Sequence, residues 1–317
     1  MKAYLGVDVG SVSTKLIVVD DFLNILASIY TSTAGRPIET LQECLRTIHP
    51  DLDSDIEICG VGVTGSGREV ASVIVGADIV KNEITAHAIA ASHMVPEVGT
   101  IIEIGGQDSK IIILKNGIVT DFAMNTVCAA GTGSFLDHQA ARLGIPIEDF
   151  GALALKCENP VRIAGRCSVF AESDMIHKQQ LGHSTESIIA GLCEALVRNY
   201  LNNVGKGKDI KPTVVFQGGV AANVGIKAAF ENALGCEIIV PEHFVVMGAI
   251  GVAFLARNHT KKVGNTKFKG FDASEFDYQA RSFECKNCSN LCEIIQIYQN
   301  GELAARWGGR CGRWDTL

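Results

Sequence analysis

The sequence contains no apolar run that approaches the roughly 18 residues of a membrane-spanning helix. Asp8 interrupts the first apolar stretch, and the opening residues 1–8 are typical of a strand and not of a signal peptide. The sequence also lacks a G-x-x-x-x-G-K-[ST] motif, which argues against a P-loop nucleotide site. We therefore expect a cytoplasmic protein without a membrane anchor.

Positive charge is in short supply. The chain has 28 Lys and Arg against 35 Asp and Glu, for a net charge of −7. Residues 257–317 carry 10 basic and 7 acidic side chains, a charge of +3, which leaves −10 for the remainder. The acidic body argues against nucleic acid as a partner. The shift in charge indicates a domain boundary near residue 258.

Hydrophobic residues and cysteine are abundant. The 317 residues are 47% hydrophobic, which is enough for two domains with their own cores. Eleven cysteines in a chain without an export signal favour reduced thiols, metal ligands or redox chemistry over disulfides.

Two segments repeat one strand–turn–strand pattern about 95 residues apart. The first spans residues 2–31, and the second runs from Ile101 to Ala123 with an Asn116-Gly117 hairpin turn. An acid, a glycine, a hydroxyl and a lysine recur in register: Asp8 with Glu103, Gly10 with Gly105, Thr14 with Ser109, and Lys15 with Lys110. The pattern indicates an internal duplication.

Such hairpins suit phosphate binding. Glycines allow the backbone to turn tightly and approach a ligand, and hydroxyls and turn N–H groups donate to phosphate oxygens. Asp8, with Glu103 or Asp108, is suited to hold Mg²⁺. The expected phosphate-binding residues are Gly10, Ser11, Ser13, Thr14, Lys15, Glu103, Gly105, Gly106, Ser109 and Lys110.

A third segment, residues 212–223, is predicted to be a buried strand that ends in glycines and leads into a helix. Gly218 and Gly219, with Val220 and Asn223, would let a flat adenine ring lie on the backbone. Residues 247–253 form a predicted helix of small residues suited to close interdomain packing. Together these segments resemble the superfamily of actin, Hsp70 and sugar kinases.

The run Gly60–Gly65 matches G-x-G-x-x-G and is followed by Asp78, but we do not interpret it as a dinucleotide site. A lone match is weak, and Ile56–Val63 is predicted to be one continuous strand.

Cys128 and Cys167 each precede a predicted helix. The unpaired N–H groups and positive dipole end of a helix N-terminus favour a thiolate or a bound anion. Two thiolates are half of the ligands of a four-iron cluster, and a symmetric dimer would supply four. The alternative is that both are ordinary buried cysteines.

With these cysteines, the chain resembles the ATP-dependent activators of 2-hydroxyacyl-CoA dehydratases, which are grouped with the ATPase subunits of benzoyl-CoA reductase. The resemblance covers residues 3–257 and depends on residues 6–11, 64–68, 82–87, 105–110, 128–133, 167–173 and 217–220.

The resemblance implies an α/β fold of duplicated actin-like, ribonuclease H-like ATPase domains with a small cysteine-containing C-terminal extension. The first lobe would span residues 1–95, closed by a helix near 245–257, and the second residues 96–257. Residues 258–317 would form a linker and a cysteine-rich tail.

The resemblance also implies a homodimer with one [4Fe-4S] cluster held by Cys128 and Cys167 of each subunit. ATP and Mg²⁺ would drive a low-potential electron from this cluster to an iron–sulfur acceptor enzyme, with ferredoxin or flavodoxin as donor. Asp8 would anchor Mg²⁺, Gln107 or Asp108 would position the attacking water, and Gly131 and Gly133 would belong to the nucleotide site.

The tail contains Cys285, Cys288, Cys292 and Cys311 around a predicted hairpin with an Asn300-Gly301 turn. These thiols could bind zinc or a second iron–sulfur cluster, or remain reduced structural cysteines. Similar tails occur in reductases of double-cubane iron–sulfur proteins, so the acceptor could be of that kind.

Two other functions use the same nucleotide fold. One is a small-molecule kinase of the sugar or acetate kinase type, and the other is a nucleotide-dependent regulator without redox chemistry. Neither accounts for residues 82–87 or for the two cysteines before helices.

Overall fold

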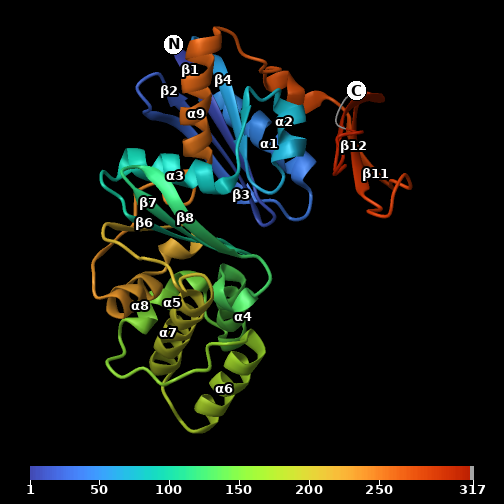
Figure 1. The fold of residues 1–317 in the computed structure, drawn as a ribbon. Coiled ribbons are helices and arrows are strands. Elements are labelled where there is room, and N and C mark those ends of the chain that lie inside the picture. The colour runs from blue at the N-terminus through green and yellow to red at the C-terminus, as the bar shows by residue number, and fades with distance from the viewer. Residues whose placement is uncertain (315–317) are drawn as a thin grey trace. The chain divides into compact units, whose positions relative to one another are not determined.

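The computed structural model describes residues 1–314, which divide into two compact units. Unit 1 consists of residues 1–86 and the chain from Gly248 onward, and unit 2 consists of residues 87–247. The chain passes between the units inside α3 (Glu83–Met94) and at the start of α9 (Met247–Val263), both labelled in Figure 1.

Each unit is built on a five-stranded sheet. The strands of unit 1 are β1 (Lys2–Val9), β2 (Ser13–Asp20), β3 (Ile25–Ser32), β4 (Glu57–Thr64) and β5 (Ile79–Val80). Those of unit 2 are β6 (Thr100–Ile104), β7 (Ser109–Lys115), β8 (Ile118–Asn125), β9 (Val214–Gln217) and β10 (Ile238–Ile239).

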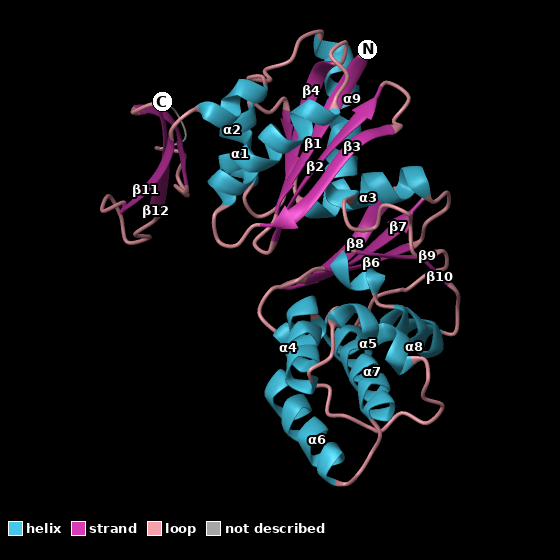
Figure 2. Cartoon of the chain, turned by 180° about the vertical axis from the view of Figure 1, so that it is seen from behind, coloured by secondary structure: helices cyan, strands magenta, loops and turns pink. Residues whose placement is uncertain are grey.

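The two sheets have the same topology (Figure 2). Their strand orders are β3-β2-β1-β4-β5 and β8-β7-β6-β9-β10. In each sheet the first three strands form an antiparallel meander, and the last two are added in parallel beside the first. The predicted α/β fold with duplicated domains is therefore confirmed.

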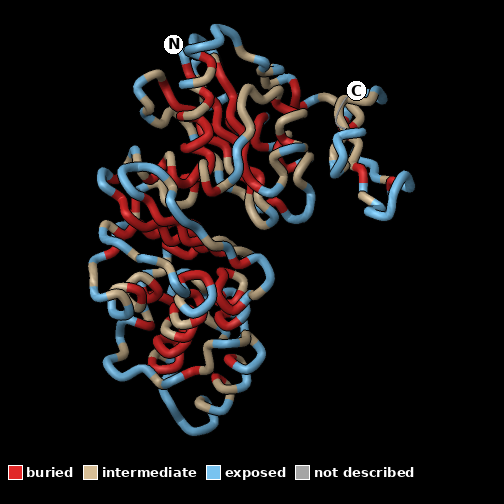
Figure 3. The backbone as a smooth tube through the Cα atoms, viewed as in Figure 1, coloured by how far each residue is buried: buried red, intermediate tan, exposed pale blue. Residues whose placement is uncertain are grey.

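Helices pack against both sheets to complete the cores. Unit 1 contributes α1 (Pro37–Ile48) and α2 (Arg68–Val75), and unit 2 contributes α4 (Gly133–Leu143), α5 (Ile147–Ala154), α6 (Ser168–Gln180), α7 (Thr185–Asn203) and α8 (Val224–Leu234). Every residue of β1 after Lys2 is buried, as expected for a central strand covered on both faces. Figure 3 shows this burial concentrated in the sheets and in α7.

α9 lies against β1 and β4, and glycines make this approach possible. A Cβ on Gly6 would collide with the carbonyl oxygen of Ala249, and one on Gly62 with that of Val252. Asp78 accepts hydrogen bonds from the Val61 N–H at 2.8 Å and the Thr266 hydroxyl at 2.7 Å. Packing against α9 therefore accounts for Gly62, and local hydrogen bonding accounts for Asp78.

The tail forms a three-stranded sheet that packs onto unit 1. Its strands are β11 (Tyr278–Glu284), β12 (Glu293–Gln299) and β13 (Glu302–Trp307). The predicted hairpin is confirmed, because β12 pairs with β13 across Asn300 and Gly301, both at positive φ. Tyr278 and Ile297 are buried in the core cluster of unit 1, so the sheet is part of that unit and not a detached module.

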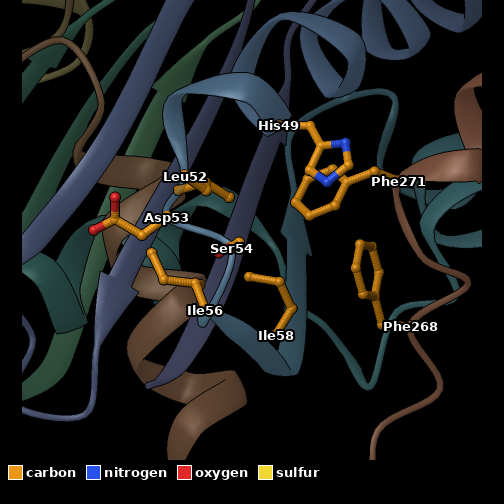
Figure 4. A pocket seen from close by; sticks show the side chains of 8 residues that line it. All are labelled: His49, Leu52, Asp53, Ser54, Ile56, Ile58, Phe268 and Phe271. Atoms are coloured by element: carbon orange, nitrogen blue, oxygen red, sulfur yellow. The ribbon is translucent and has the colours of Figure 1, made fainter.

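Unit 1 also contains a pocket of about 220 Å³ between the start of β4, the turn after α1 and the segment before the tail sheet. The rings of His49 and Phe271 stack at 4.4 Å on one wall, and Phe268 and Asp53 lie on others (Figure 4). None of the predicted phosphate-binding residues lines it. Among residues 1–314, no helix is both long enough and apolar enough to cross a membrane.

Candidate functional site

The first hairpin places an acid and a lysine together below a glycine turn. The Gly10 N–H donates to the Ser13 carbonyl at 2.9 Å. Asp8 and Lys15 are cross-strand neighbours, and the distance from Lys15 Nζ to Asp8 Oδ2 is 3.2 Å. Asp8 is only 5% exposed, so its carboxylate is held in place at the base of the turn.

The second hairpin repeats this arrangement with one more acid. The Gly105 N–H donates to the Asp108 carbonyl at 3.0 Å. Lys110 Nζ lies 2.9 Å from Glu103 Oε2 and 2.8 Å from Asp108 Oδ2. Burial by itself disfavours the charged ammonium, but Glu103 and Asp108 outweigh it and raise the pKa of Lys110.

A glycine turn follows the neighbouring parallel strand in each unit. Gly65, after β4, has φ of 96°, and Gly218, after β9, has φ of 86°. A Cβ on Gly65 would lie 2.7 Å from Asp8 Oδ1, and one on Gly218 would lie 2.9 Å from Glu103 Oε1. The duplication therefore extends to these turns, each of which packs directly on the acid of its own hairpin.

Three buried polar atoms beside the acids have no hydrogen-bond partner within the described part of the chain: Thr64 Oγ1, Ser109 Oγ and Gln217 Oε1. Thr64 is the cross-strand neighbour of Asp8, and Gln217 that of Glu103. Buried polar atoms are normally paired, so their position fits a polar ligand at the strand ends.

The other predicted nucleotide residues differ in accessibility. Ser11 and Gln107 are exposed, and Gly106 and Asp108 are half-buried. Thr14 is fully buried, and its hydroxyl lies 2.9 Å from that of Thr33. Asn223 caps α8 by accepting the Ile226 N–H at 3.1 Å, so its side chain has a structural role.

Cys128 is followed by a single 3₁₀ turn (Ala129–Gly131), and α4 begins only at Gly133. This differs from the helix expected directly after the cysteine. The side chain of Asn125 holds the loop, because its Nδ2 donates to the Cys128 carbonyl at 2.7 Å and its Oδ1 accepts the Cys128 N–H at 3.0 Å.

Cys167 is the N-cap residue of α6, as expected, and makes no capping bond through its side chain. Asn199 on α7 donates to the Gly165 carbonyl at 2.6 Å, and thereby anchors the loop before Cys167. A Cβ on Gly131 would lie 2.9 Å from Asn199 Oδ1. The segments carrying the two cysteines therefore meet at one buried asparagine.

Large apolar side chains next to both cysteines are exposed. Val127 is 97% exposed, Val169 66% and Phe170 68%. Cys128 and Cys167 themselves are half-buried.

The comparisons with known proteins agree with this geometry. The model of the BadF/BadG/BcrA/BcrD ATPase family matches residues 5–256. The chain belongs to this family. It is 38% identical over 265 residues to the (R)-2-hydroxyglutaryl-CoA dehydratase activating ATPase of Acidaminococcus fermentans, covering 81% of this chain and 98% of the relative.

Two solved structures show the same fold. The crystal structure of component A of the A. fermentans (R)-2-hydroxyglutaryl-CoA dehydratase has a TM-score of 0.74 and 35% identity, covering 82% of this chain and 100% of that one. The activator of the 2-hydroxyisocaproyl-CoA dehydratase from Clostridium difficile, with bound ADPNP, has a TM-score of 0.73 and 33% identity, covering 83% and 97%.

Two tail cysteines of this ATPase are neighbours, because the Cys285 N–H donates to the Cys292 carbonyl at 2.8 Å. No three Cys, His, Asp or Glu side chains in residues 1–314 form a group that could hold a metal ion. Hydrogen bonds from the Asn287 backbone and from the Trp314 indole lower the pKa of the Cys285 thiol. Cys288 and Cys311 are exposed. A tail metal site thus stays a prediction.

The five remaining cysteines are buried or half-buried thiols. Burial raises the pKa of Cys44 to about 11 and that of Cys193 to about 12. Cys59, Cys157 and Cys236 are half-buried.

The sequence motifs assign no role to Asn125 or Asn199, and they include Thr64-Gly65 only within residues 64–68 of the family resemblance. The signal for Thr64-Gly65 was a polar residue and a glycine at a strand end, as in Gln217-Gly218. This polar residue followed by glycine does not recur at the 95-residue offset of the hairpins, because the connections before β4 and β9 differ in length. The two asparagines carry no local pattern.

Proposed function

We propose that this ATPase uses ATP to drive electron transfer from a [4Fe-4S] cluster to an iron–sulfur acceptor enzyme. The observation that supports this best is the meeting of the Cys128 and Cys167 segments at Asn199, within the unit that also carries the Glu103–Lys110 hairpin. A kinase or a regulator needs the hairpins but has no use for two half-buried thiols on adjoining loops.

Each unit offers its own set of groups for Mg²⁺ and nucleotide. In unit 1, Asp8 would hold Mg²⁺ through water, and the Gly10–Ser13 turn would donate N–H groups to phosphate. In unit 2, the Gly105–Asp108 turn would do the same, and Gly218–Val220 would support the adenosine. Gln107 or Asp108 would orient the attacking water, because both lie on the turn and are at least partly accessible.

Two cysteines per chain leave a four-iron cluster with half of its protein ligands, so we propose that a second copy supplies the other two. Val127, Val169 and Phe170 are exposed apolar side chains within three residues of a cysteine, and apolar surface of this kind suits contact with another chain. Such a cluster would supply one-electron chemistry at low potential. A shift of roughly 200 mV needs on the order of 5 kcal/mol of differential binding.

The acceptor is proposed from the relatives, which are activators of 2-hydroxyacyl-CoA dehydratases. A dehydratase of this kind or a double-cubane protein would accept the electron, and ferredoxin or flavodoxin would donate it.

Anaerobic purification followed by iron analysis, absorption spectroscopy and sedimentation tests the proposal. We expect a brown, oxygen-labile dimer with about four irons in the bridging site. Replacing either Cys128 or Cys167 with serine should remove this cluster and weaken the dimer. The half-buried Cys157 provides the control, since Cys157→Ser should change neither.

All these variants are compared in a chain whose four tail cysteines are also replaced with serine. The measured iron then excludes any iron bound in the tail. Retention of a full cluster spectrum by both Cys128→Ser and Cys167→Ser would overturn the assignment. A colourless protein whose ATP turnover depends on a small acceptor would identify a kinase instead.

A further inference from the structure

The nucleotide hairpin of unit 2 caps the helix that follows Cys128. The N-cap residue of α4, Thr132, makes no capping bond through its side chain. The Gly133 N–H donates to the Gly105 carbonyl at 2.9 Å, and the Ser134 N–H donates to the Gly106 carbonyl at 2.8 Å. These hairpin carbonyls thus satisfy N–H groups that a helix start leaves unpaired.

Ser134 reinforces this link through its side chain. Its hydroxyl donates to the same Gly106 carbonyl at 2.6 Å. A Cβ on Gly133 would lie 3.1 Å from the Gly105 carbonyl oxygen and 3.2 Å from Val220 Cγ2. The start of α4 is therefore packed tightly between the hairpin and the Gly218–Val220 turn.

In its middle and last turn, α4 is linked to α6 by one carboxylate. Glu172 Oε2 lies 2.9 Å from His138 Nε2, and Glu172 Oε1 lies 2.9 Å from Arg142 Nε. Glu172 is about one turn into the helix that begins at Cys167. Glu172 thereby gives α6 a direct side-chain contact with α4.

The loops before the helices are attached elsewhere. Asn125, at the end of β8, holds the Cys128 backbone, and Asn199, on the buried α7, holds Gly165. Both helices also pack in the core of unit 2, α4 through Phe135 and Leu136 and α6 through Ala171 and Met175. Each cysteine thus lies between a loop held by an asparagine and a helix linked, directly or through Glu172, to the Gly105–Asp108 turn.

We propose that Ser134 and Glu172 are positioning residues that transmit the state of the nucleotide hairpin to Cys128 and Cys167. This proposal rests on the proposed function. Ser134 couples the Gly106 carbonyl to α4, and Glu172 couples α4 to α6. The hairpin responds to nucleotide because Lys110 holds Asp108 in this turn, and Mg²⁺ with phosphate would compete for that carboxylate.

The test uses the full-length dimer with its cluster and the non-hydrolysable analogue ADPNP. We measure the KM and kcat of ATP hydrolysis, the ADPNP-induced shift of the cluster potential, and the electrons transferred per ATP. For Ser134→Ala and Glu172→Gln we expect a KM within about twofold of wild type. The number of electrons transferred per ATP should fall by roughly three- to tenfold, because the loss of one hydrogen bond changes an equilibrium constant by about this factor. Ser134→Thr should restore coupling.

Two control variants remove comparable bonds elsewhere. Ser72→Ala deletes a hydroxyl–carbonyl bond of 2.7 Å in α2, and Glu194→Gln removes an ion pair of 3.3 Å to Arg198. Both should leave electrons per ATP unchanged. Unaltered coupling in Ser134→Ala and Glu172→Gln would overturn the proposal. Loss of hydrolysis together with coupling would also overturn it, because Ser134 would then only build the nucleotide site.

Hydrogen exchange separates this proposal from the proposed function, because it needs no cluster. ADPNP should change the protection of backbone amides in residues 125–133 and 166–172 of wild type, and Ser134→Ala should reduce this change. If wild type holds no cluster but shows this response, the proposed function fails and the transmission stands. If residues 125–133 do not respond in wild type, the transmission is wrong.

Discussion

Replacement of Lys110 with methionine should be among the most destabilising single changes in unit 2. The Lys110 side chain is 3% exposed and contacts both Glu103 and Asp108. Without the ammonium, the buried Glu103 carboxylate has lost its positive partner, and breaking a buried ion pair in this way costs about 3–5 kcal/mol. Urea unfolding followed by circular dichroism should show a midpoint lower by about 1–2 M.

The duplication supplies a matched control. Lys15 occupies the same register position in unit 1, but it is 15% exposed and lies at the longer distance of 3.2 Å from Asp8 Oδ2. Lys15→Met should therefore cost less, about 1–3 kcal/mol. Adding Glu103→Gln to Lys110→Met should recover much of the lost stability, because it removes the unpaired buried charge.

The pH dependence has a definite sign. The folded state raises the pKa of Lys110, so the folded chain binds this proton more tightly than the unfolded chain does. The stabilisation is complete below the unfolded pKa of roughly 10.4 and is lost as the pH rises through the folded value. The difference in the free energy of unfolding between wild type and Lys110→Met should hence be constant from about pH 6 to 9. It should shrink only above about pH 10. An equal cost for Lys110→Met and Lys15→Met, or no recovery with Glu103→Gln, would refute this reasoning.

Three further predictions follow from the sites. Asp8→Ala should abolish or greatly slow ATP hydrolysis while leaving the iron content unchanged, and a wild-type rate would exclude the Mg²⁺ role. Gly218→Ala should abolish nucleotide binding, because its φ is 86° and its Cβ would collide with the Ile104 carbonyl; Gly117→Ala, at a φ of 74° in open space, should cost only about 1 kcal/mol of stability. Elemental analysis should show less zinc or iron when serine replaces all four tail cysteines; unchanged metal content would identify them as ordinary thiols.

The structure also decides how the tail is tested. A chain ending near residue 258 would lose Tyr278 and Ile297 from the core of unit 1. It would also lose hydrogen bonds from Gln42 to the Ser274 and Phe276 carbonyls at 2.8 and 2.9 Å. Loss of metal from such a truncation could reflect unfolding, whereas cysteine substitution leaves this packing in place.

Local features were predictable from the sequence. Asp8 pairs with Lys15, and Glu103 with Lys110, because each pair lies on two antiparallel strands joined by a short turn. The register of such a hairpin brings residues seven apart in the sequence opposite each other. The Asn116-Gly117 and Asn300-Gly301 hairpins follow because these residues tolerate the positive φ that such turns need. Cys167 at the start of α6 was predictable from the periodic pattern that follows it.

Contacts between distant segments were not predictable. Asn199 reaches a carbonyl 34 residues earlier in the chain, and no local pattern distinguishes it from any other helical asparagine. In the sequence, Ser134 resembles any serine at the start of a helix. Only the folded chain brings its hydroxyl to the Gly106 carbonyl, 28 residues away. The short 3₁₀ turn after Cys128 was missed because its residues also suit a regular helix.

The sequence alone determined the family, the duplicated hairpins and the position of Cys167 before a helix, because each depends on residues close together in the chain. Tertiary structure alone decided what those parts are attached to. Packing of α4 and α6 in one core with α7 brings the cysteine loops to Asn199, places the start of α4 on the Gly105–Asp108 turn, and joins α4 to α6 through Glu172. Such contacts arise from the relative placement of whole elements, which a buried core sets and short-range patterns do not record.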